Sequence, residues 1–118
     1  MANPNIVIVS TIYGKTALAA LTTVTANVIT NSTGSGTVDK LNNIILSNYT
    51  ASAVGANVVI NRSATTYYLG GNVSIPANSS LVLLGKDTAI YLEEGDVLQA
   101  NVTANTAVTI TASYEIIS

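Results

Sequence analysis

The end of the chain alternates apolar and polar side chains with a period of two. The apolar members are Val108, Ile110, Ala112, Tyr114 and Ile116, and the polar members between them are Thr109, Thr111, Ser113 and Glu115. A strand with one buried and one wetter face has this period, whereas a helix would spread the same apolar side chains around its circumference. The C-terminal stretch therefore predicts a long strand.

Turn signals divide the rest of the chain into similar short runs. Clusters of Gly, Pro, Asn, Asp and Ser recur roughly every ten residues. The clearest lie at residues 31–37, 63–66, 70–71, 76–80 and 93–96. Between them, residues 38–49 are apolar on both faces, which predicts a strand at the centre of a sheet. About nine or ten short strands with this spacing indicate an all-β fold, an antiparallel β-sandwich of immunoglobulin-like or jelly-roll type in a single domain.

Other runs are less regular. Residues 5–12, 21–30, 57–62 and 66–69 are further predicted strands, and residues 51–56 predict a turn of small residues. Tyr13, Gly14 and Lys15 predict a break, and the Ala and Leu content of residues 16–21 leaves a helical turn open as an alternative. We therefore divide the chain into an N-terminal arm or entry strand, residues 1–15, and a β-sandwich domain, residues 16–118.

The composition favours a protein that assembles with other subunits over one that is a monomer in solution. Only 8% of the 118 residues are charged, the mean hydropathy is +0.47, and His, Cys, Trp and Phe are absent. Such a surface is poor in the groups that keep a monomer strongly hydrated. Disulfides are impossible without cysteine. Extra stability would then come from sheet packing or from contacts with other subunits, so a homo-oligomer is expected.

Charge and hydropathy argue against two classes of partner. The net charge is −2 and the cations are scattered at Lys15, Lys40, Arg62 and Lys86, which does not suit nucleic acid because phosphate binding needs a clustered cationic face. No basic residue precedes the apolar run near the N-terminus, and residues 16–38 are too polar to span a bilayer. We expect neither a nucleic-acid nor a membrane partner.

The chain offers little for catalysis. Proton transfer near neutral pH most often uses His, and a nucleophilic Ser or Thr needs a neighbouring base. The local acidic cluster is Glu93, Glu94 and Asp96, with Asp87 upstream. These carboxylates either bind a hard cation such as calcium or simply keep a turn in water, and the second reading is favoured. We therefore expect no enzyme activity, no catalytic residue, no metal and no cofactor.

A few apolar side chains are candidates for contacts with a partner. Tyr67 and Tyr68 are adjacent and should point to opposite faces of a strand, so at least one should be exposed. Filling the core is their more ordinary use. Ile6 and Ile8 belong to the N-terminal segment 3–12, which we expect to add a strand to the exposed sheet edge of a neighbour. Tyr13, directly after this segment, is a further candidate contact residue.

Several short motifs resemble a known family. They are Tyr13-Gly14-Lys15-Thr16, Val38-Asp39-Lys40-Leu41-Asn42 with residues 44–48, Ile75-Pro76-Ala77, Ser80-Leu81, Ile90-Tyr91-Leu92-Glu93-Glu94-Gly95-Asp96 and the ending Ser113-Tyr114-Glu115-Ile116-Ile117-Ser118. Together they are similar to small virion structural proteins of tailed bacteriophages, especially phages of cyanobacteria. The resemblance implies a non-enzymatic β-sandwich component of the particle and carries over no catalytic residue.

These observations lead to one expected function and two alternatives. The expected function is a capsid decoration or cement protein, an oligomer with a trimer favoured, that stabilises junctions between capsid subunits by non-covalent contacts. Its partners would be the major capsid protein or other virion proteins, and its location the virion, assembled in the host cytoplasm. The alternatives are a neck, tail or fibre-attachment component and a carbohydrate-binding module on the virion.

Overall fold

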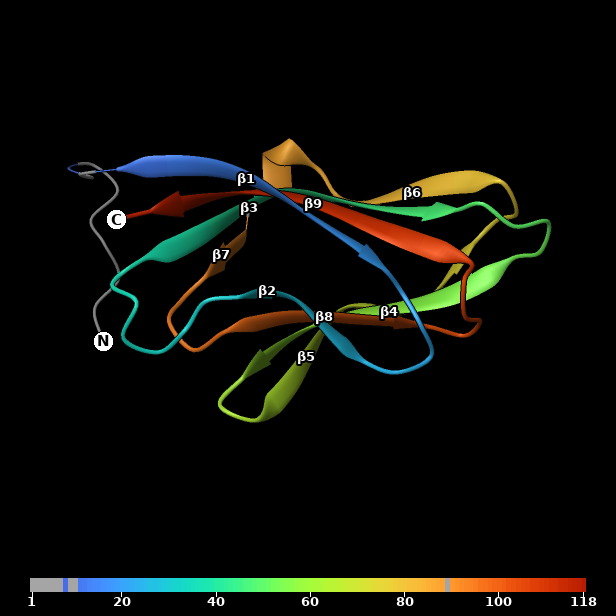
Figure 1. Ribbon diagram of the computed structural model, residues 1–118, viewed down its shortest axis with the longest axis horizontal. Coiled ribbons are helices and arrows are strands. Elements are labelled where there is room, and N and C mark those ends of the chain that lie inside the picture. The colour runs from blue at the N-terminus through green and yellow to red at the C-terminus, as the bar shows by residue number, and fades with distance from the viewer. Residues whose placement is uncertain (1–7, 9–10, 89) are drawn as a thin grey trace.

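The computed structural model describes residues 8, 11–88 and 90–118, without the side chain of residue 86. These ranges contain nine strands and one short 3-10 helix (Figure 1). The elements are β1 (Ile12–Ala20), β2 (Ala26–Thr30), β3 (Val38–Asn48), β4 (Val54–Arg62), β5 (Thr65–Ile75), β6 (Ser79–Leu84), η1 (Lys86–Thr88), β7 (Ile90–Leu92), β8 (Val97–Val102) and β9 (Val108–Ile117).

The strands form two antiparallel sheets, which lie as an upper and a lower layer in Figure 1. Sheet A has the order β1-β9-β3-β6, and β7 pairs with β3 beside β6. Sheet B has the order β2-β8-β4-β5. The predicted β-sandwich is therefore confirmed.

The strand pairs are nested along the chain. β4 pairs with β5, β3 with β6 and β7, β2 with β8, and β1 with β9. A long hairpin that is rolled up so that alternate pairs fall in opposite sheets has this connectivity, which is that of a jelly roll. Of the two predicted sandwich types, the observed topology is the jelly roll.

The core lies between the inner faces of the two sheets. Its completely buried members come from both sheets, and the largest are Leu21, Leu41, Ile44, Leu46, Ile75, Leu92, Leu98 and Ile110. In β9 the period-two pattern correctly predicted the burial of Val108, Ile110 and Ala112, whereas Tyr114 and Ile116 are only partly buried and Ile117 is buried instead. Burial of aliphatic side chains on both inner faces stabilises the sandwich.

β3 is the central strand of sheet A, as predicted. It pairs with β9 along one edge and with β6 and β7 along the other, and most of its side chains are buried. β6 pairs with residues 44–48 of β3 and β7 with residues 39–41, so the two short strands share the same edge of β3. The inward side chains of β3, which include Leu41, Ile44 and Leu46, are buried in the core, whereas Ile45 on the other face is only partly buried.

β1 differs from the prediction. The expected break at Tyr13, Gly14 and Lys15 is absent, because these residues pair one by one with Ile116, Glu115 and Tyr114 of β9. The helical alternative for residues 16–21 is also wrong, since β1 continues to Ala20. Thr11 and Ser118 extend the pairing by two backbone hydrogen bonds and one between their hydroxyls. Long-range pairing with β9 overrides the local turn propensity of Gly14.

β4 and β5 are also longer than predicted. β4 begins at Val54, within the expected turn, and β5 continues through Gly70 and Gly71 to Ile75. The pairing of the two strands shifts register between Ala56 and Val59, which is where these glycines lie opposite. At Gly70 a Cβ atom would lie 3.0 Å from Val73 and 3.1 Å from Leu83 of β6. Glycine therefore allows β5 to pass close to sheet A instead of ending the strand.

Candidate contact surfaces

The predicted interface residues lie on several parts of the molecule. Ile6 is outside the described residues, as is most of segment 3–12. Ile8 is 76% exposed, and Tyr13 is 60% exposed at the start of β1. Tyr67 and Tyr68 are 57% and 66% exposed and line different pockets, so the prediction that they point to opposite faces is confirmed. Their role in an interface stays a prediction.

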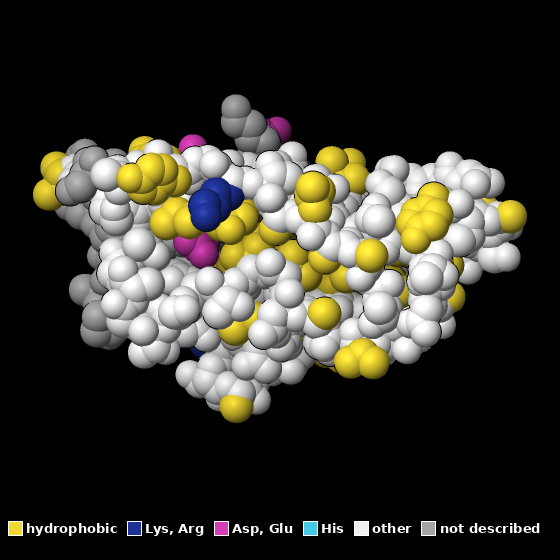
Figure 2. Space-filling model, in the orientation of Figure 1, with side chains coloured by type: hydrophobic (Ala, Val, Ile, Leu, Met, Phe, Trp, Pro, Cys, Tyr) yellow, Lys and Arg dark blue, Asp and Glu magenta, His cyan; other side chains and the backbone are white. Residues whose placement is uncertain are grey.

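One open edge of the sandwich lies between β1 and β2. Figure 2 shows hydrophobic side chains in the hollow between the two layers along this edge. Ala17 and Ala19 of β1 and Val28 of β2 are partly buried there against the core. β1 also exposes Ile12 and Leu18 on its other face, Leu18 at 74%. β1 is a long edge strand, which can pair with another chain, and Lys15 is the type of charged residue that limits such pairing.

The opposite open edge carries an apolar groove, here called the tyrosine groove. It is lined by Ile60, Arg62, Tyr67, Ile90 and Tyr91, and its volume is about 380 Å³. Tyr67 comes from β5 and Tyr91 from β7, so the groove lies between edge strands of the two sheets. Tyr and Arg beside aliphatic side chains are the residue types that most often dominate protein interfaces.

Arg62, at the rim of the tyrosine groove, is anchored by Asp96. The guanidinium donates to both carboxylate oxygens of Asp96, with Nε–Oδ1 at 2.7 Å and Nη2–Oδ2 at 2.6 Å, and to Glu93 Oε2 at 3.0 Å. Asp96 is only 1% exposed. Burial opposes ionisation of Asp96, but hydrogen bonds from Arg62 and from the Glu93 backbone N–H outweigh it and lower its pKa. The hydrogen bond to Asp96 and the negative charges of Asp96 and Glu93 in turn raise the pKa of Arg62. The ion pair ties β4 to the turn at residues 93–96, here called the acidic turn.

The acidic turn differs from the prediction in one respect. Asp96 does not remain in water, because Arg62 lies against it. Glu94 Oε2 accepts a hydrogen bond from the Gly36 backbone N–H at 2.6 Å. Within the described ranges, no group of three His, Cys, Asp or Glu side chains is placed to hold a metal ion. Glu93 and Asp96 thus link the turn to Arg62 of β4, and Glu94 links it to the loop at residues 31–37. Asp87 lies apart from them in sequence, within η1.

Asn31 organises the same end of the molecule. Its amide donates to the carbonyl groups of Thr37 and Leu92, and its Oδ1 accepts from Ser35. Its backbone also exchanges hydrogen bonds with residues 95 and 96. Sequence reasoning placed Asn31 in an ordinary loop, because nothing local distinguishes it from the many other Asn residues. It is 3% exposed and joins the loop at residues 31–37 to the acidic turn.

Asp39 is a second buried carboxylate that sequence reasoning did not single out. It lies on β3, paired with Leu92 and Ile116, and is 4% exposed. Burial raises its pKa to about 6, and the charge of Lys15 opposes this rise. The pKa of Tyr114 is also raised, by burial and by the charge of Asp39. The burial of Asp39 could have been inferred from the sequence, because Asp39 falls within the predicted central strand.

Comparison with solved structures finds a protein of similar fold. The described part of the chain contains no helix that is long and apolar enough to cross a membrane. No protein-family model matches the chain, and no curated protein matches it. A chain of the acidic stable capsid structure of Helicobacter pylori bacteriophage KHP30 superimposes with a TM-score of 0.57 at 11% identity, over 94% of this chain and 90% of that chain. The chain therefore shares its fold, over nearly the whole length of both chains, with a component of that capsid structure.

Proposed function

We propose that this chain is a structural protein of a phage virion and that it decorates the capsid, stabilising junctions between capsid subunits. The observation that carries the proposal is the fold shared with a chain of the KHP30 capsid structure along nearly the full length of both chains. The sequence motifs support it independently, because they resemble small virion proteins of tailed phages. The narrower link with cyanobacterial phages depends on those motifs alone.

The distribution of apolar side chains supports a role based on contact area. Large apolar side chains are exposed on β1, on β5 and on β6, including Leu18, Tyr67 and Val82 at 74%, 57% and 61%. Association that buries such side chains gains free energy, and many weak copies on one particle add their contributions. A decoration protein requires no reaction to stabilise the particle in this way.

The tyrosine groove is the part of this surface that we assign to the capsid. Tyr67 and Tyr91 offer large, rigid contact areas, and Arg62 is held in place by Asp96 before any partner binds. A side chain that is already ordered loses less entropy on association. An apolar side chain of a capsid subunit would fill the groove.

Self-association is the second part of the proposal. The protein would assemble as a trimer over capsid junctions, and segment 3–12 would add a strand to an edge of a neighbouring subunit. Native mass spectrometry of the purified protein measures the oligomer directly. A trimer is expected. A protein that stays monomeric at micromolar concentration would contradict this part of the proposal.

The test of capsid binding uses particles that lack this protein. Purified wild-type protein is added back, and bound protein is measured after sedimentation and located by electron cryomicroscopy. Binding at capsid junctions is expected, and Tyr67→Ala with Tyr91→Ala should reduce it at least tenfold. Tyr68→Ala is the matched control, because Tyr68 is similarly exposed on the other face of β5. No binding of the wild-type protein to particles would contradict the proposal.

A further inference from the structure

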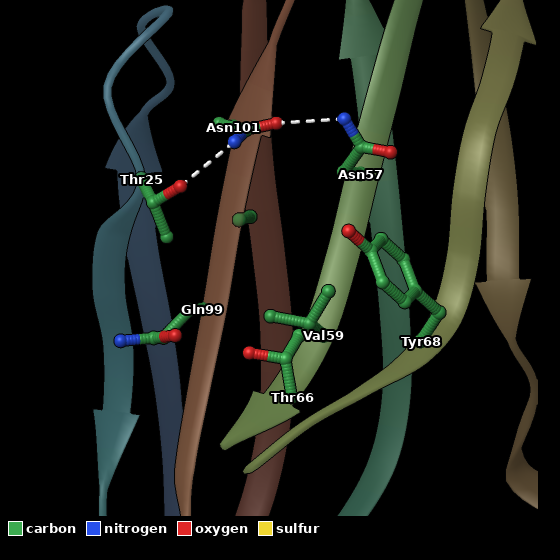
Figure 3. A pocket seen from close by; sticks show the side chains of 8 residues that line it. Thr25, Asn57, Val59, Thr66, Tyr68, Gln99 and Asn101 are labelled. Carbon is green, nitrogen blue, oxygen red and sulfur yellow. Dashed lines mark hydrogen bonds between the residues drawn. The ribbon is translucent and has the colours of Figure 1, made fainter. Parts of the chain in front are cut away.

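The outer face of sheet B carries a polar pocket that the proposed function does not use. Its volume is about 150 Å³, enough for about five water molecules or one sugar ring. Figure 3 shows Asn57, Gln99, Asn101 and Tyr68 around it, contributed by three strands of sheet B. We refer to it as the amide pocket.

The strand register explains why these side chains meet. Tyr68 of β5 lies opposite Val59 of β4, which lies opposite Gln99 of β8, so the three side chains form a row across the sheet. Asn57 lies opposite Asn101 in the next row on the same face. Side chains directly opposite each other on antiparallel strands point to the same side. The pocket is therefore built by rigid strands and not by loops.

Hydrogen bonds hold the amides in fixed orientations. Asn57 Nδ2 donates to Asn101 Oδ1 at 2.9 Å, and Asn101 Nδ2 donates to Thr25 Oγ1 at 2.8 Å. The backbone N–H of Asn72 donates to Asn57 Oδ1 at 2.7 Å. Gln99 Nε2 donates to Asn27 Oδ1 at 2.9 Å. A polar network that is ordered in advance loses little entropy when a ligand binds.

Part of the hydrogen-bonding capacity remains open toward the pocket. Gln99 Oε1 and the hydroxyl groups of Tyr68 and Thr66 have no hydrogen-bond partner among the described residues. The Asn57 and Asn101 amides each retain a second N–H. Adjacent donors and acceptors of this kind match the paired hydroxyl groups of a sugar, each of which can both donate and accept.

Tyr68 supplies an aromatic surface beside the amides. Its side chain is 66% exposed, and it lies along the edge of the pocket in Figure 3. A side chain at residue 71 would touch the ring at 3.4 Å from Cδ2, so Gly71 leaves that side of the ring uncovered. The electron-rich face of an aromatic ring attracts the polarised C–H groups of a pyranose.

We propose that the amide pocket binds a neutral saccharide through stacking on Tyr68 and hydrogen bonds to Gln99, Asn57 and Asn101. The side chains that line the pocket carry no charge, which disfavours sulfated, sialylated or phosphorylated ligands. The pocket lies on a different face of β5 from the tyrosine groove. The saccharide site and the capsid contact are therefore independent of each other.

The test is a glycan array probed with purified, fluorescently labelled protein that is multimerised on beads, because single sugar sites are weak. Binding to one group of neutral glycans is expected. A titration of the corresponding free oligosaccharide, followed by NMR, should shift the side-chain amide signals of Gln99, Asn57 and Asn101. Tyr68→Ala should weaken binding at least tenfold, whereas Tyr68→Phe should retain most of it.

Tyr67→Ala is the matched control, because Tyr67 is the neighbouring residue with similar exposure on the opposite face. It should leave glycan binding unchanged. Gln99→Ala provides a second test that leaves the tyrosine in place and should weaken binding at least threefold. Failure to bind any neutral glycan would overturn the inference, as would binding that persists in folded Tyr68→Ala and Gln99→Ala variants. Neither result would affect binding to particles, so the two proposals fail separately.

Discussion

Asp96 is the most deeply buried charged side chain in the described residues, at 1% exposed. A buried carboxylate is tolerated when its oxygens are hydrogen-bonded and its charge is paired. Arg62 supplies two of these hydrogen bonds and the Glu93 backbone supplies another. The stability of this end of the sandwich should therefore depend on Arg62, although its own side chain is 47% exposed.

Arg62→Ala should destabilise the fold by about 2 kcal/mol, because Asp96 is left buried without its partner. Urea unfolding measures this change. Arg62→Ala combined with Asp96→Asn should recover part of the loss, since a neutral amide costs less to bury. The pKa of Asp96 is lowered in the fold, so its contribution is present above about pH 4 and is lost as the pH falls below that value. Equal stability of Arg62→Ala and wild type would contradict this account.

Asp39 should have the opposite pH dependence. Its pKa is raised to about 6 by burial, so the folded state retains a proton that the unfolded chain loses near pH 4. Its favourable contribution is therefore complete below about pH 4 and is lost as the pH rises through 6. Asp39→Asn should gain about 1–2 kcal/mol relative to wild type between pH 4 and pH 7, measured by unfolding at each pH. A difference that does not change with pH would contradict the prediction.

Single-residue roles were only partly predictable from the sequence. Adjacent tyrosines on a strand must face opposite ways, so the separation of Tyr67 and Tyr68 followed directly. The burial of Asp96 did not follow, because its partner Arg62 is 34 residues away in sequence. Asn31 was missed for the same reason, since its partner Leu92 lies 61 residues away. Amide and carboxylate roles depend on contacts that local patterns do not encode.

At the scale of elements, the β4–β5 hairpin turns on two residues with positive φ. Ser63 and Ala64 have φ values of 52° and 62°. A two-residue turn with positive φ at both positions is type I′, which favours Asn followed by Gly. Ser63 and Ala64 are therefore strained relative to the residues that such turns prefer.

Replacing Ser63 with Asn and Ala64 with Gly should stabilise the protein by about 1 kcal/mol and raise the Tm by several degrees. Thermal unfolding followed by circular dichroism measures the change. Ser63→Val is the control and should lower the Tm, because a β-branched residue tolerates positive φ poorly. An unchanged or lower Tm in the Asn-Gly variant would contradict the assignment of strain to this turn.

Strand positions were more predictable than strand lengths. β3 and β9 followed from their apolar patterns, because those patterns extend over most of each strand. β1 and β5 extended beyond the predicted ends at Gly14 and at Gly70-Gly71. Glycine signals a turn locally, but pairing with β9 and close approach to β6 determine what happens at these positions.

At the scale of the whole molecule, the order of strands could not be predicted. Alternation fixes which side chains face inward but does not determine which strands pair. Immunoglobulin-like and jelly-roll sandwiches both meet the same local patterns. The nested pairs, from β4–β5 outward to β1–β9, distinguish them, and the outermost pair joins residues between 89 positions (Ala20 with Thr109) and 105 positions (Ile12 with Ile117) apart.

The same arrangement leaves both lateral edges of the sandwich partly open. Apolar side chains reach the surface between β1 and β2, and the tyrosine groove opens between β5 and β7. Exposed apolar area at sheet edges is costly for an isolated protein and useful for one that assembles. The shape of the fold and the proposed role on a particle therefore agree.

The central claim is that this protein is a structural part of the virion present in many copies. Quantitative mass spectrometry of purified particles measures its copy number relative to the major capsid protein. The account predicts one copy, or one trimer, of this protein for each junction between capsid subunits. About a dozen copies per particle would instead indicate a symmetric ring at the neck or tail. Absence of the protein from purified particles would contradict the claim.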